Sequence, residues 1–131
     1  MSSYLSIYVK PKDVDRKILI GSFTRNDEIY DFLWENNLSG YAYGSELNEE
    51  KFYELDSREL WHHVQEYREE VSRNKERLMM MKSLGDRYDV DEIITWQTYV
   101  DEKVRTLHRL ECLQDLFSDC NDIEKVYTNY D

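Results

Sequence analysis

The side chains best suited to chemistry in this sequence are histidines and a cysteine that lie on two predicted helices. His108 and Cys112 are four positions apart, so they share one face of a helix. If the two helices fold back near residues 87–88, facing residues have numbers that sum to about 175, and His63 then lies beside Cys112. Imidazole and thiolate groups suit a soft cation such as zinc. Because helical hairpins often carry histidines without a ligand, we predict no metal at His63, His108 and Cys112.

A second group of candidate ligands is the acid-rich stretch over residues 86–92. It lacks the mid-loop glycine and the closing bidentate glutamate of a calcium-binding EF-hand, and the helix dipole alone explains acids at a helix start. The segment that contains Gly40 and Gly44 lacks the Lys and the following Ser or Thr that a phosphate-binding loop requires. We therefore predict no cofactor and no catalytic residue, and expect a protein that is not an enzyme.

The charge balance favours a protein partner over nucleic acid. The chain has 28 Asp and Glu against 17 Lys and Arg, a net charge of −11 at pH 7. Phosphate backbones need clustered basic side chains, and an anionic membrane surface repels an acidic protein. Acids gather at residues 46–70 and 89–102. These acids could bind a partner with a basic surface, either by imitating a nucleic-acid backbone or by steering the association. The alternative interpretation is that they form a solvated helix face.

Export and membrane signals are not visible in the sequence. No run approaches the roughly 20 apolar residues that span a bilayer, and the N-terminal residues lack the pattern of a signal peptide. Cys112 and Cys120 lie eight residues apart, about 12 Å along a continuous helix, which is too far for a disulfide. We expect reduced thiols, no membrane contact and a cytoplasmic location.

The elements that must position these residues predict an α+β fold. Residues 4–9 and 18–23 have strand composition and read as a β-hairpin, and Thr24 is the expected N-cap of a short helix over residues 25–36. Residues 47–55 read as a helical turn or an early start to the next helix, and residues 126–130 have strand composition. The expected architecture is a small antiparallel sheet of two to four strands, a short helix and a long antiparallel helical hairpin.

The helical hairpin is the best-determined element. Over residues 58–84 the apolar positions recur at alternating spacings of four and three, a coiled-coil type of seam with one polar member, Asn74. A second amphipathic helix is predicted over residues 90–118, and Gly85 marks the bend between them. We expect a single domain. Its parts are the β-hairpin, short helix and loop (1–45), the helical hairpin (46–119) and a C-terminal strand or tail (120–131).

The candidate binding residues gather near the predicted bend. Met79–Met81 are three consecutive methionines, of which the seam needs only Met81, and methionine is common on adaptable binding surfaces. The predicted partner-binding residues are Met79, Met80, Arg77, Arg87, Ile94 and Trp96. In the alternative, the seam residues Asn74, Leu78 and Met81 pair with a second copy as a homodimer, because a buried polar residue can fix register and oligomeric state.

Two fragments and the layout of the chain resemble short uncharacterised proteins of phages and prophages of Gram-positive bacteria. The fragments are Ser22-Phe23-Thr24-Arg25 leading into Glu28-Ile29-Tyr30, and Lys125-Val126-Tyr127-Thr128-Asn129. The resemblance implies a viral origin and the host cytoplasm, and carries no activity. The leading hypothesis is a non-enzymatic, acidic protein-interaction module that modulates or inhibits a host protein such as a nucleic-acid-targeting defence factor. The alternative is a structural or assembly protein that homo-oligomerises through its helical hairpin.

Overall fold

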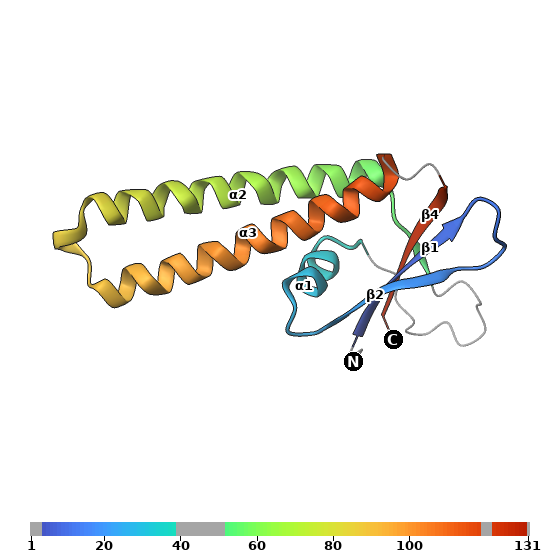
Figure 1. The fold of residues 1–131 in the computed structure, drawn as a ribbon, viewed down its shortest axis with the longest axis horizontal. Helices are drawn as coiled ribbons and strands as arrows, with labels where there is room; N and C mark the ends of the chain where they lie inside the picture. Colours follow the sequence, from blue (N-terminus) through green and yellow to red (C-terminus); the bar gives the residue numbers. More distant parts are fainter. Residues whose placement is uncertain (1–3, 39–51, 119–121, 131) are drawn as a thin grey trace.

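The fold, seen in a computed structural model, is α+β, with a four-stranded antiparallel sheet and a long hairpin of two α-helices (Figure 1). The structure describes residues 4–38, 52–118 and 122–130. A shorter helix lies between the hairpin and the sheet, and the bend of the hairpin is the part farthest from the sheet (Figure 1). The fold class predicted from the sequence is confirmed.

The sheet has the strand order β2-β1-β4-β3. β1 (Tyr4–Pro11) and β2 (Ile18–Thr24) form the predicted hairpin. β4 (Ile123–Tyr130) lies inside the sheet between β1 and β3 (Tyr53–Glu54), so residues 123–130 of the predicted C-terminal strand or tail form a strand. The three pairings are antiparallel, and the first residues of β1 lie beside the last residues of β4.

The prediction of a helical turn over residues 47–55 is wrong where the structure describes that segment. Tyr53 and Glu54 form β3 by pairing with Thr128 and Tyr127 of β4. The cause is tertiary, because β4 supplies hydrogen-bond partners from the far end of the chain. The helical hairpin accordingly begins later than residue 46, and residues 47–51, like Gly40, Gly44 and Cys120, lie outside the described ranges.

The short helix α1 (Glu28–Glu35) begins later than predicted. Thr24 pairs with Tyr4 at the end of β2, so it cannot cap the helix. Asp27 is the N-cap instead, and its Oδ1 accepts a hydrogen bond of 2.9 Å from the backbone N–H of Ile29. Both residues are good capping types, and the pairing of Thr24 in the sheet decides between them.

The long helices are α2 (Ser57–Ser83) and α3 (Val90–Ser118), and they form the predicted antiparallel hairpin. Arg68 bonds to Glu111, and Gln114 bonds to the backbone of Ser57, which is close to the predicted alignment. A short 3-10 turn, η1 (Gly85–Arg87), makes the bend. Within the described residues, neither of these helices is long and apolar enough to cross a membrane.

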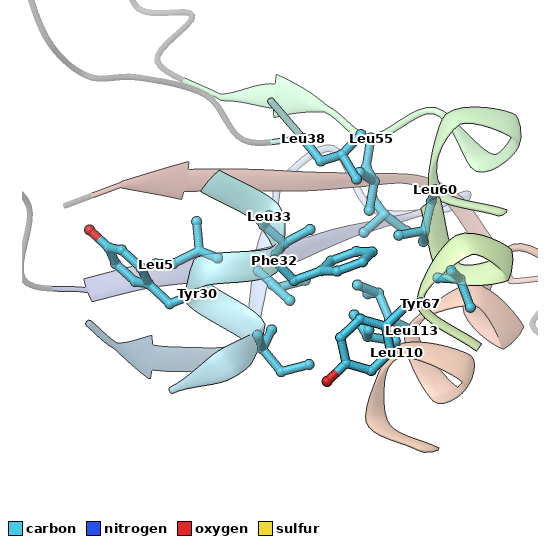
Figure 2. Close-up of a cluster of buried hydrophobic side chains, with 14 of the residues drawn as sticks. Leu5, Tyr30, Phe32, Leu33, Leu38, Leu55, Leu60, Tyr67, Leu110 and Leu113 are labelled. Carbon is cyan, nitrogen blue, oxygen red and sulfur yellow. The ribbon is translucent and has the colours of Figure 1, made fainter. Parts of the chain in front are cut away.

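One hydrophobic cluster joins the sheet, α1 and the sheet-proximal half of the hairpin (Figure 2). Figure 2 shows side chains of α1 pointing toward α2 and α3, with the ring of Phe32 against Tyr67 at a centroid distance of 5.7 Å. The buried residues of this cluster end at Val71 along α2 and begin with Leu107 along α3, where the partly buried Val104 also packs against them. We call the helical residues that contribute to the cluster the base of the hairpin, and residues 74–100 the tip.

Candidate interaction surfaces

The tip carries a group of apolar side chains that face solvent. Met79 is 70% exposed, Met80 60%, Val90 67% and Ile94 57%, and Leu84 at the bend is 41% exposed. We call these five residues the tip surface. Several exposed apolar side chains at one end of a folded protein favour an interaction site more than a single scattered residue does. The structure thus places three of the predicted partner-binding residues, Met79, Met80 and Ile94, on one end of the molecule.

The tip surface is divided between two sides of the hairpin. Adjacent residues of a helix point about 100° apart, so Met79 and Met80 face different sides. Lys82 donates a hydrogen bond of 2.6 Å to Oε1 of Gln97, which joins α2 to α3 on one side. Met79 lies three residues before Lys82, and Ile94 lies three residues before Gln97, so Met79 and Ile94 belong to that side.

The other side of the tip is organised around Trp96. The indole Nε1 donates a 3.2 Å hydrogen bond to the backbone carbonyl of Asn74, and the guanidinium of Arg77 lies 5.1 Å from the centre of the ring. Trp96 is half-buried and lines a shallow cleft of about 410 Å³ with Arg77 and Tyr88. The sequence predicts Trp96 as a partner-binding residue. In the structure its indole also links α3 to α2 through the contacts with Asn74 and Arg77.

Charge is segregated between the two helices of the tip. Residues 73–87 hold five bases and two acids, and all five bases (Arg73, Lys75, Arg77, Lys82 and Arg87) are exposed. Residues 89–102 hold five acids and no base. The antiparallel packing therefore sets a basic rod beside an acidic rod, with the apolar tip surface on their flanks.

The predicted oligomer seam is filled from within the chain. Leu78 and Met81 are only 6% and 8% exposed, on α2, which packs against α3 of the same hairpin. Asn74 is half-buried in the same row, and its Nδ2 is buried without a hydrogen-bond partner in the structure. A second copy therefore cannot use Leu78 and Met81 as its contact while the hairpin stays closed.

The histidine and cysteine side chains do not converge as a ligand set. His63 Nδ1 lies 3.6 Å from a carboxylate oxygen of Glu66, whereas His108 and Cys112 are exposed on α3. Across the described part of the chain, no group of three His, Cys, Asp or Glu side chains could hold a metal ion.

An acidic cleft of about 510 Å³ lies between α1 and α2, a feature that the sequence analysis did not find. Its carboxylates are Glu28, Asp31, Glu35, Glu66, Glu69 and Glu70. Lys103 of α3 reaches the cleft and lies 3.5 Å from Glu28. The acids of α2 were noted in the sequence, but the docking of α1 against α2 depends on tertiary packing and has no local sequence signal.

Three side chains of the hairpin, Tyr67, Lys103 and Arg109, contact the start of α1. The Tyr67 hydroxyl donates a 2.8 Å hydrogen bond to Glu28, and burial together with this bond raises the pKa of Tyr67. Burial lowers the pKa of Lys103, but the carboxylate of Glu28 and its neighbours outweigh that effect and raise it. Arg109 donates two hydrogen bonds to the two oxygens of Asp27, at 3.2 and 3.0 Å. These contacts fix one wall of the acidic cleft.

No protein-family model, curated protein or solved structure matches this chain. The function must therefore be inferred from the surfaces of the protein. The tip surface offers apolar contact area flanked by charge, and the acidic cleft offers carboxylates that attract cationic groups. Both arrangements are suited to binding.

Proposed function

We propose that the protein is a non-enzymatic protein-interaction module that binds a protein partner through the tip of its helical hairpin. The observation that carries the proposal is the exposure of Met79, Met80, Val90 and Ile94, each more than half exposed, around one bend. A solvent-exposed helix does not need these side chains for its own packing, whereas an interface gains from flexible, polarizable methionine.

The charges of the chain support a narrower proposal about the partner. The acidic rod of α3 and the net charge of −11 favour a partner with a basic surface, because complementary charge steers association and disfavours other partners. The resemblance to phage proteins supports the more specific proposal of a host protein as partner, such as a nucleic-acid-targeting defence factor. The protein then acts as a modulator or inhibitor in the host cytoplasm.

Affinity capture with two tip variants tests the proposal. Met79→Glu places an acid four residues after Lys75 and three before Lys82, and Ile94→Lys places a base three residues after Asp91. Both changes suit the local helix charge, so the circular dichroism spectrum should stay the same while capture of the partner is lost. Trp96→Ala is a poorer variant, because it also removes the hydrogen bond to Asn74.

The matched control is an exposed apolar residue at the other end of the molecule. Leu19 is 54% exposed on β2, which is an edge strand of the sheet. Leu19→Glu should leave capture unchanged. Loss of capture with Leu19→Glu, together with normal capture by the two tip variants, would move the contact to the sheet edge and reject the tip.

The second candidate function is assembly of the protein with itself. The segregation of charge on the tip favours it, because a two-fold axis would set the basic rod of one copy on the acidic rod of the other. The contact would then use the exposed flanks, Met79 and Ile94, and not the filled seam. Light scattering over a wide range of concentration separates the two candidates, and a strict monomer at high concentration would eliminate assembly.

A further inference from the structure

A cluster of aromatic rings holds a lysine ammonium on the face of the sheet that points away from the helices. The Nζ of Lys17 lies 4.8 Å from the ring centre of Phe52 and 4.8 Å from that of Tyr127. Both distances are within the range of about 6 Å at which a cation is attracted to an aromatic face. Two rings therefore contact a single cation.

Two rings of the cluster project from paired strands of the sheet. Tyr8 of β1 and Tyr127 of β4 are directly opposite each other in the register. Their neighbours Ile7 and Val126 belong to the core, so alternation along the strands turns both tyrosines to the other face. The ring of Phe52 meets Tyr8 edge-on, at a centroid distance of 5.0 Å and an angle of 86°. Phe52 meets Tyr127 at 6.3 Å and 74°.

Aromatic rings, and not carboxylates, position the ammonium of Lys17. Asp13 and Asp15 lie in the same connection between β1 and β2, yet within the described residues Lys17 forms no ion pair. The neighbouring Lys10, in contrast, pairs with Glu124. The electron-rich faces of Phe52 and Tyr127 are thus the groups that contact this ammonium.

We propose that the rings of Phe52 and Tyr127, with Tyr8 packed edge-on against Phe52, form a binding site for methylated ammonium groups, and that Lys17 is its exchangeable internal occupant. Lys17 is exposed and lies in the connection between two strands, so its side chain can leave without disturbing the sheet. A primary ammonium is strongly hydrated. A methylated ammonium gives up less hydration, and its methyl groups pack on the ring faces, so it can replace Lys17. The site is separate from the hairpin tip and does not depend on the proposed function.

The ligand chemistry has two sources, a free metabolite such as choline and a trimethylated lysine of another protein. Titration of the full chain with choline, and separately with acetylated trimethyllysine amide, distinguishes them by affinity. Proton NMR shifts of the tyrosine and phenylalanine rings report binding. Lys17→Ala empties the site, so we expect at least one of the two ligands to bind this variant about fivefold more tightly than the wild type.

Two further variants and one further ligand control for the loss of charge, for the aromatic ring and for the charge of the ligand. Lys12→Ala removes an equal charge from the same connection and should bind like the wild type. Phe52→Leu keeps apolar bulk but removes the ring, and should abolish binding while the circular dichroism spectrum is unchanged. The uncharged carbon analogue of choline should not bind. Equal binding of that analogue, or no ring shifts with either ammonium ligand in the Lys17→Ala variant, would overturn the proposal.

Discussion

The base and the tip of the hairpin are built from the same two helices but treat apolar side chains in opposite ways. At the base, Leu60 and Leu110 are completely buried against the sheet and α1. At the tip, Leu78 and Met81 are buried only within the hairpin, and Met79 and Ile94 face solvent. The base therefore joins the hairpin to the rest of the fold, whereas the tip retains apolar surface that the fold does not bury.

This difference follows from the number of layers that cover each region. The base has neighbours on more than one side, because α1 and the sheet pack against it (Figure 1). The tip has only its partner helix, which covers one stripe of each rod. A side chain outside that stripe remains exposed unless another molecule covers it, and Met79 and Ile94 are side chains of this kind.

The largest expected effect is a cavity in the base. Leu110→Ala should lower the free energy of unfolding by about 4 kcal/mol, because the side chain is fully buried and its neighbours cannot collapse around the gap. The matched change at the tip, Leu78→Ala, should cost about 2 kcal/mol, since two helices alone can relax around the gap. Urea unfolding measures both, and equal losses would contradict the distinction between base and tip.

The next effect concerns the attachment of α1 to the base. Asp27→Ala removes the N-cap of α1 and both hydrogen bonds from Arg109, and should cost about 2 kcal/mol. Asp27→Asn keeps an oxygen that can cap the helix but loses the charge, so it should cost less than half as much. Thermal unfolding of the two variants separates capping from the ion pair, and a smaller loss for Asp27→Ala than for Asp27→Asn would reject this assignment.

Alkaline pH should weaken the same attachment. In the unfolded chain, a tyrosine hydroxyl loses its proton at about pH 10. In the folded protein, the raised pKa of Tyr67 keeps its hydroxyl protonated above that pH. The unfolded state then binds fewer protons, so the free energy of unfolding falls by about 1.4 kcal/mol per pH unit above that point. Burial and the hydrogen bond to Glu59 raise the pKa of Tyr53 to about 12, so it adds to the loss between pH 10 and about 12.

Tyr67→Phe isolates the contribution of one hydroxyl. The variant keeps the ring against Phe32 but cannot ionise, so its stability should fall less steeply with pH than that of the wild type. Melting temperatures measured at intervals from pH 8 to pH 11 provide the comparison. Parallel slopes for the two proteins would show that Tyr67 does not titrate differently on folding.

The position of most elements, but not their contacts, could be predicted from the sequence. The bounds of α3 were predicted without error because its apolar stripe and the acids at its start agree. β3 has only two residues and depends on β4, and the acidic cleft depends on where α1 docks. Met79, Met80 and Ile94 could be placed on the outside from periodicity, whereas the bond from Trp96 to Asn74 required the alignment of two helices.

A smaller stabilising effect is expected inside the tip. The buried Nδ2 of Asn74 has no hydrogen-bond partner in the structure, and an unsatisfied buried donor is costly. Asn74→Leu should therefore raise the free energy of unfolding by about 1 kcal/mol, as measured by urea unfolding. A loss of stability would show that Asn74 makes a contact that is essential to the hairpin.

The smallest effect on stability should accompany the largest effect on binding. Met79→Glu and Ile94→Lys change exposed side chains, so each should alter the free energy of unfolding by less than about 0.5 kcal/mol. The dissociation constant of the captured partner for these variants and for Leu19→Glu tests whether the tip is the contact. We expect binding at least about 100-fold weaker for each tip variant, as for the loss of an interface hot spot, and within about twofold of the wild type for Leu19→Glu. Unchanged binding by both tip variants would contradict this expectation.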